Sequence, residues 1–123
     1  MARAADYDIV SDSKVSLRIG GDIDHDFAIG MDSPNVAARS ILTYMVDTVN
    51  PNDLKFRLNI INGNNLSTEV GTYTTSSNVA RTFQEVIAAS VLTATNNKLR
   101  VSVLSGSGTL EIADIVLWYL KNV

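Results

Sequence analysis

The sequence predicts an all-β protein, and three observations support this fold class. Val, Ile, Thr and Ser dominate the chain, whereas strong helix formers are sparse. Short apolar runs are separated by turn signals about every ten residues, a spacing typical of β-sandwiches and barrels. The 123 residues have the length of one domain, and no linker, low-complexity tract or repeat divides them. We therefore expect residues 1–123 to form a single antiparallel β-sandwich of two sheets.

The first half of the sequence contains three candidate strands. Residues 14–21 alternate apolar and polar side chains and end at a pair of glycines. Residues 22–30 alternate again, with three aspartates on one face and, on the other face, Ile23, His25 and Phe27. A loop around Pro34 follows. Residues 40–49 are apolar on both faces, which predicts a central strand that is covered on both sides.

The next segment predicts a β-hairpin. After a turn at "NPND", residues 54–61 place Leu and Phe side chains on one face and Lys55, Arg57 and Asn59 on the other. The following "NGNN" is the strongest hairpin signal in the chain, because Asn and Gly tolerate the positive φ angles of tight turns. Residues 65–75 then form the return strand, with Gly71 marking a bulge or a bend.

The last third predicts a further strand to about Ile87, one turn of helix at "AASVL", and two closing strands. "TNNK" and "SGSG" are turns on either side of the first closing strand, whose inward residues are Leu99, Val101 and Val103. About eight strands in one domain suggest a jelly roll, with an immunoglobulin-like sandwich as the alternative.

The final strand carries the only Trp. Alternation places Ile115, Leu117 and Tyr119 on the core face, with the Tyr119 hydroxyl at its rim. The opposite face then presents the apolar stripe Val116, Trp118 and Leu120. We expect this stripe to be a contact surface, for protein rather than sugar, because Val and Leu offer sugar hydroxyls no hydrogen-bonding partners.

The segments "FQEVIAASVLTATNNKLRVSV" and "GTLEIADIVLWY" resemble the C-terminal half of galactose-binding-like jelly-roll modules. "ILTYMVD" and "LKFRLNIING" also resemble the central strands of that family, so the resemblance extends from about Ile41 onward. Relatives often carry Pro at the position of Ala88, and sugar-binding relatives are richer in Trp and Tyr. Many relatives are carbohydrate-binding modules or lectins and others are structural. The resemblance therefore implies a jelly-roll fold and a non-catalytic binding module for carbohydrate, but it transfers no ligand-binding residue.

Sugar rings stack on flat aromatic side chains while nearby polar groups bind their hydroxyls. Tyr73 lies in a Thr-rich segment and is the aromatic residue expected to be most exposed. The candidate ligand-binding residues are Tyr73, Arg57, Asn59 and Lys55. A solvated sheet face would explain the same polar residues.

Three alternate carboxylates at Asp22, Asp24 and Asp26 have a spacing that suits Ca²⁺. An EF-hand is excluded because Phe27 and Ser33 stand where that motif needs Gly and Glu. We therefore expect no cofactor, with Ca²⁺ as the one candidate if these three carboxylates bind a metal. The alternative is an acidic, solvated strand that resists edge-to-edge pairing.

We expect no enzymatic activity. The single His25 has no nucleophile or orienting partner in the sequence, there is no Cys, and no catalytic or nucleotide-binding motif is present. A net charge of −3 without any Lys/Arg run argues against nucleic-acid binding, and no apolar run is long enough to span a membrane. A cytoplasmic location is expected if the chain is complete, and an extracellular one if it is an excised module.

The alternative function is that of a structural β-sandwich subunit that self-assembles or docks in a larger protein complex. Apolar residues occur on strand faces that should be polar, namely Ile61, Leu104 and Val116. If they cluster, they form a patch of the kind that monomers rarely expose. A homo-oligomer or a larger protein assembly would then cover it.

Overall fold

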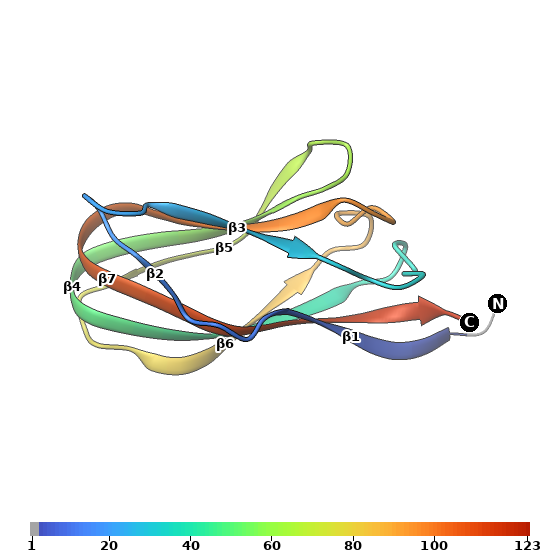
Figure 1. Ribbon diagram of the computed structural model, residues 1–123, viewed down its shortest axis with the longest axis horizontal. Coiled ribbons are helices and arrows are strands. Elements are labelled where there is room, and N and C mark those ends of the chain that lie inside the picture. Colours follow the sequence, from blue (N-terminus) through green and yellow to red (C-terminus); the bar gives the residue numbers. More distant parts are fainter. Residues whose placement is uncertain (1–2) are drawn as a thin grey trace.

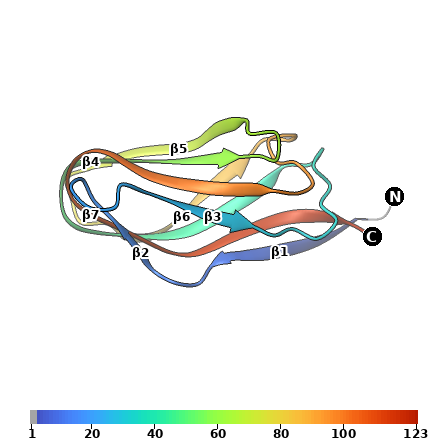
Figure 2. The same ribbon diagram turned by 45° about the horizontal axis from the view of Figure 1, so that its top comes forward.

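The computed structural model describes residues 3–123 and consists of two packed layers of antiparallel strands, as Figures 1 and 2 show. This arrangement confirms the predicted β-sandwich with jelly-roll architecture. The strands are β1 (Arg3–Ser11), β2 (Val15–Leu17), β3 (Asp24–Ile29), β4 (Ser40–Ile61), β5 (Ser67–Thr75), β6 (Ala80–Ile87) and β7 (Asn97–Asn122). No helix among these residues is long and apolar enough to cross a membrane.

The two longest strands, β4 and β7, pair with each other and pass through both layers. We call one layer the β3 layer. Its centre is formed by residues 97–103 of β7 and 54–61 of β4, with β3 beside β7 and β5 beside β4. In the β1 layer, residues 109–122 and 40–49 form the centre, flanked by β1 and β2 on one side and by β6 on the other. Each layer therefore has one face toward the core and one toward solvent.

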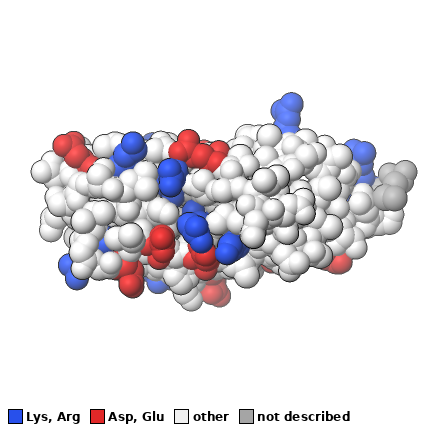
Figure 3. Space-filling view, turned by 90° about the horizontal axis from the view of Figure 1, so that it is seen from above, with Lys and Arg blue, Asp and Glu red and all other residues white. Residues whose placement is uncertain are grey.

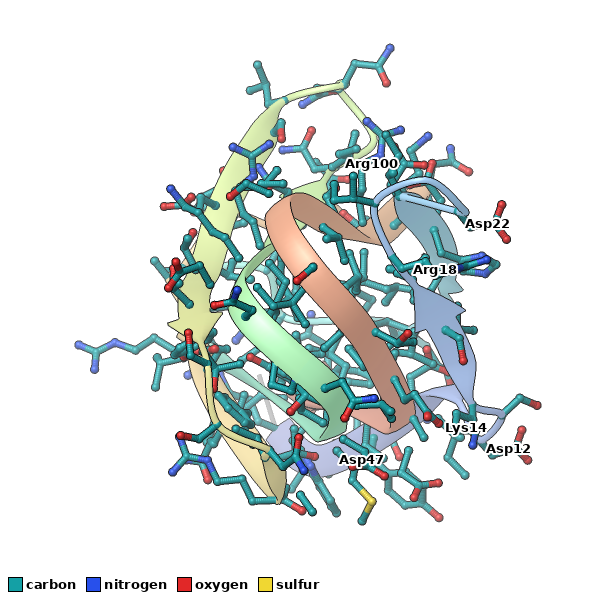
Figure 4. The ribbon with its side chains drawn as sticks, turned by 90° about the vertical axis from the view of Figure 1, so that its left-hand side faces the viewer. Asp12, Lys14, Arg18, Asp22, Asp47 and Arg100 are labelled. Atoms are coloured by element: carbon teal, nitrogen blue, oxygen red, sulfur yellow. The ribbon has the colours of Figure 1, made fainter. Side chains whose placement is uncertain are left out.

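The two layers are joined at a corner where β4 and β7 bend together, seen end-on in Figure 4. Asn50 and Asp53 bend β4 with φ angles of 49°, and Gly106 bends β7 with a φ of 88°. A Cβ atom on Gly106 would lie 2.1 Å from the carbonyl oxygen of Asp53. "NPND" and "SGSG" were expected to be turns between strands. They are instead the two halves of this corner, through which the strands continue.

The core lies between the layers and is formed by the inward side chains that alternation predicts. Leu99, Val101 and Val103 are buried in the β3 layer, and Ile115 and Leu117 are buried in the β1 layer. The hairpin at "NGNN" and the bulge beside Gly71 are also present, the latter as a register shift in the pairing of β4 with β5.

Tyr119 occupies the rim of the core, as predicted from the final strand. Its hydroxyl accepts a hydrogen bond from the backbone N–H of Asp32 at 2.8 Å and donates one to Asp6 Oδ2 at 3.1 Å. Burial and the neighbouring Asp6 raise the pKa of this hydroxyl, while the N–H of Asp32 lowers it.

The structure corrects four expectations. β1 was not predicted as a strand, and residues 88–92 form a turn without helix. The outer face of residues 40–49 is not covered within the described chain, because Ile41, Met45 and Val49 are exposed. Finally, Val116 lies in the β1 layer, whereas Ile61 and Leu104 lie toward opposite ends of the other, so the expected patch of these three residues does not form.

Candidate functional site

The polar residues that were predicted to bind a ligand lie on the outer face of the β3 layer. Lys55, Arg57 and Asn59 alternate with the buried side chains of β4, so all three point to solvent. Figure 3 shows this face, where basic and acidic side chains are mixed. Asn59 Nδ2 donates to Ser67 Oγ at 3.0 Å, and Arg57 Nε is buried without a hydrogen-bonding partner in residues 3–123. Within residues 3–123, no aromatic side chain joins these three residues on this face.

Tyr73 does not belong to that group, which corrects the predicted site. It pairs with Phe56 across β4 and β5, so it shares the inward face. Its ring lies 5.6 Å from the ring of Phe56 and 4.9 Å from the ring of Phe83. Tyr73 is therefore a packing residue at the edge of the core.

The hydroxyl of Tyr73 is held by a buried carboxylate. Glu85 Oε2 accepts hydrogen bonds from Tyr73 at 2.5 Å and from Tyr44 at 2.7 Å. Burial, followed by these bonds to Glu85, raises the pKa of both tyrosines above the ordinary value. Because Glu85 Oε2 accepts both bonds, this network joins β5 and β6 to β4.

The predicted calcium ligands do not converge. Asp26 binds Arg100 in a fork, with Nε–Oδ1 at 2.7 Å and Nη2–Oδ2 at 2.9 Å. Asp22 lies in the turn before β3 and stands apart from Arg100 in Figure 4. Among the residues described, no group of three His, Cys, Asp or Glu side chains is placed to hold a metal ion. The guanidinium of Arg100 is the main cause of the lowered pKa of Asp26.

His25 is exposed on β3, where its ring packs 4.5 Å from the ring of Phe27. Its cross-strand neighbour is Val101, and it makes no side-chain hydrogen bond with residues 3–123. This environment is that of a packing residue rather than of a general base, which would need a partner to orient it.

The outer face of the β1 layer carries the exposed aromatic residues. Trp118 on β7 is 46% exposed and Tyr7 on β1 is 54% exposed, and they are direct cross-strand partners. Their ring centroids are 5.5 Å apart with an interplanar angle of 42°. This is the spacing of a favourable aromatic pair, so each ring fixes the orientation of the other.

The aromatic pair continues as a row across the sheet. Trp118 is paired with Ile41 on β4, and Ile41 is paired with Val86 on β6, whose side chain is also exposed. With strands about 4.8 Å apart, the row from Tyr7 to Val86 is about 14 Å long. We call this set, Tyr7, Trp118, Ile41 and Val86, the aromatic row.

Polar groups lie on one side of the aromatic row. Trp118 Nε1 donates to Thr43 Oγ1 at 3.2 Å, which orients the indole and leaves the Thr43 hydroxyl proton free to donate elsewhere. Gln84 on β6 is paired with Thr43 and is exposed. An amide and a hydroxyl therefore border the aromatic row.

A hollow of about 190 Å³ lies on the other side of the row. Its lining residues are Ala5, Asp6, Arg39, Ile41, Trp118, Tyr119 and Leu120. The carboxylate of Asp6 accepts the hydrogen bond of the Tyr119 hydroxyl on the core side of the sheet. Arg39 is exposed and makes no ion pair or side-chain hydrogen bond with residues 3–123.

The sequence predicted part of this surface. Val116, Trp118 and Leu120 share the outer face, as alternation indicated, and Trp118 is its most exposed member. Tyr7 was missed because the first residues lack a clear apolar alternation. Its place beside Trp118 follows only from the pairing of the two chain ends, which no local signal in the sequence reveals.

No protein-family model matches the sequence, and no curated protein matches it. Solved structures of carbohydrate-binding modules share its fold. A family 29 module from Piromyces equi superposes with a TM-score of 0.60 at 9% identity, over 94% of this chain and 91% of the module. A family 29 variant complexed with cellulohexaose gives 0.55 at 10% identity over 96% and 92%. CBM4 gives 0.50 at 12% identity over 86% of each chain. These similarities confirm the jelly-roll β-sandwich fold.

Proposed function

We propose that the protein is a non-catalytic carbohydrate-binding module that holds a glycan on the outer face of the β1 layer. The observation that carries this proposal is the exposed cross-strand pair of Tyr7 and Trp118. Apolar C–H faces of sugar rings stack on such rings, and two rings in register give a platform wider than one residue.

Hydrogen-bonding groups at both sides of the aromatic row support sugar as the ligand. From the sequence alone, the stripe around Trp118 favoured protein, because Val116 and Leu120 offer hydroxyls no partners. The fold brings Thr43 and Gln84 to one side of the indole and Arg39 to the other. A sugar stacked on Trp118 would therefore meet donors and acceptors at its edges, as sugar recognition requires.

The fold adds support that is independent of the site. The similar solved structures are carbohydrate-binding modules, and one of them is complexed with cellulohexaose. A sheet face on a rigid sandwich needs no conformational change to receive an extended chain.

The test is a glycan array followed by calorimetric titration with the best-bound glycan. We expect Trp118→Ala to weaken binding by about tenfold or more, taking as a guide the stacking of a nucleobase on an aromatic side chain, which contributes about 1–3 kcal/mol. Met45→Ala is the matched control, since Met45 is exposed on the same face but lies outside the aromatic row. Equal affinities for Trp118→Ala and the wild type would place the ligand elsewhere, and an array without any signal would exclude this function.

Self-assembly is the second candidate, favoured by the exposed apolar side chains of the same face: Tyr7, Ile9, Ile41, Met45, Val86 and Trp118. Light scattering distinguishes the two functions. A monomer that binds glycans supports the module, whereas an oligomer that dissociates in Trp118→Ala and binds no glycan supports assembly.

A further inference from the structure

We infer that the glycan held by the aromatic row carries an anionic substituent, a carboxylate or a sulfate, and that Arg39 binds it in the hollow beside Trp118. This inference rests on the proposed function and adds the chemical class of the ligand. It starts from the lining of the hollow, which contains one cationic side chain, Arg39, and the aromatic side chains of Trp118 and Tyr119.

The position of Arg39 at the edge of the sheet follows from alternation. Ser40 and Leu42 are buried, so Arg39 and Ile41 point to the outer face of the β1 layer. The apolar side chains of Ile41, Leu120 and Trp118 line the hollow together with Arg39. A sugar ring stacked on Trp118 would thus present its substituents toward the guanidinium.

Arg39 has no competing partner in residues 3–123. Its guanidinium pairs with no carboxylate of these residues, and Asp6, the acidic residue that borders the hollow, is bonded to Tyr119 on the core side. The acidic side chains of the outer face lie toward the corner instead: Asp47, Glu111 and Asp114. Glu111 is moreover paired with Lys14 at 2.6 Å.

The charge at this end of the face is therefore positive although the whole chain carries −3. Arg3 on β1 adds to it, because Arg3 and Ala5 share the outer face with Tyr7. A planar guanidinium matches a carboxylate or sulfate with two parallel hydrogen bonds, which a neutral hydroxyl cannot accept in the same way. An aromatic wall with a free guanidinium at its side thus favours an acidic sugar over a neutral one.

The experiment uses the full chain on a glycan array that contains neutral, uronic-acid and sulfated oligosaccharides. The best-bound glycan is then titrated against Arg39→Gln and Arg57→Gln. Arg57 is the matched control because it lies on the outer face of the other layer and its replacement changes the net charge equally. Circular dichroism checks that both variants fold.

We expect acidic glycans to give the strongest signals on the array. Stronger signals from uronic-acid glycans would identify the substituent as a carboxylate, and stronger signals from sulfated glycans would identify it as a sulfate. Arg39→Gln should lower the affinity for the acidic glycan about tenfold, as expected for the loss of a charge-assisted hydrogen bond. Arg57→Gln should bind this glycan with the affinity of the wild type. Added salt should weaken the wild-type complex.

Three results would overturn the inference. The first is that neutral glycans give the strongest array signals and bind Arg39→Gln and the wild type with equal affinity. This result would overturn the inference and leave the proposed function intact. A loss of affinity in Arg57→Gln alone would place the acidic ligand on the other layer. An array without any signal would overturn the proposed function together with this inference.

Discussion

The ring of Tyr7 packs against the ring of Trp118 across the first and last strands, with 5.5 Å between their centroids. Both side chains remain about half exposed, so the contact does not serve to fill the core. Aromatic surface left open on a sheet face is the feature from which the binding function is inferred.

The pair should act as a unit in ligand binding. We expect Tyr7→Ala to lower glycan affinity less than Trp118→Ala, and the double variant to lose less than the sum of the two. The reason is that Tyr7 both contacts ligand and orients the indole, with an aromatic coupling of about 0.5–1.5 kcal/mol. Calorimetric titration of the three variants measures this coupling. Ile9→Ala is the control, because Ile9 lies on the same face of β1 but outside the aromatic row, and it should bind as the wild type does. If the losses in Tyr7→Ala and Trp118→Ala add up in the double variant, the two residues do not act as a coupled pair.

The corner should be intolerant of a side chain at Gly106. Gly106→Ala would place a Cβ atom 2.1 Å from the Asp53 carbonyl oxygen at a φ of 88°, so we expect a loss of about 2–4 kcal/mol. Gly20→Ala is the matched control, because Gly20 has a φ of 87° but a Cβ atom there would meet no other group within 4 Å. It should cost only about 1–2 kcal/mol, the strain of a Cβ atom at a left-handed φ. Urea denaturation compares them, and equal losses would mean that crowding at the corner is unimportant.

The buried carboxylate of Glu85 should be needed for stability. Replacement by Gln removes the charged acceptor of two tyrosine hydroxyls, and we expect a loss of about 1–3 kcal/mol in urea denaturation. Glu69→Gln is the control, since Glu69 is exposed on β5 and bonds only Thr72 among the described side chains. It should change stability by about 0.5 kcal/mol or less. Similar values for both variants would show that the network contributes little.

Stability should also fall at alkaline pH. The folded chain raises the pKa of Tyr44 and Tyr73, so above pH 10 the unfolded chain releases tyrosyl protons that the folded chain retains. The stabilisation is complete below about pH 10 and is lost as the pH rises beyond it. Urea denaturation at a series of alkaline pH values tests this, and Tyr44→Phe should flatten the dependence. An unchanged slope in that variant would contradict the assignment.

Calcium should have no effect on thermal stability, because both oxygens of Asp26 are engaged by Arg100. We expect the same melting temperature with Ca²⁺ and with chelator. Asp26→Asn should lower stability by at most about 1 kcal/mol, as for other exposed ion pairs, equally in both conditions. A melting temperature that rises with Ca²⁺ in the wild type but not in Asp26→Asn would restore the predicted metal site.

Strand alternation predicted the parts of this structure that depend on neighbours along the chain. The split of the last strand into buried Leu117 and Tyr119 and outward Trp118 follows from the two-residue period alone. The corner was not predictable in the same way. Turn residues such as Asn50 and Gly106 signal a bend, but they do not say whether the chain reverses or continues into a second sheet.

Long-range pairing accounts for the errors at the candidate site. Tyr73 lies in a polar segment and looked exposed, but the register of β5 against β4 sets it beside Phe56. Tyr7 gave no signal because its partner is at the other end of the chain. Arg39 was missed for a similar reason, since only the packed sheet creates the hollow that it borders.

The most direct measurement is the fluorescence of Trp118 during titration with a glycan that calorimetry shows to bind. Trp118 is the only Trp in the chain, so its emission reports on one position. We expect a saturable change in emission whose midpoint agrees with the calorimetric dissociation constant, because the sugar would replace water over the indole. Glycan binding that saturates in the calorimeter and leaves the Trp118 emission unchanged would contradict a site on the aromatic row.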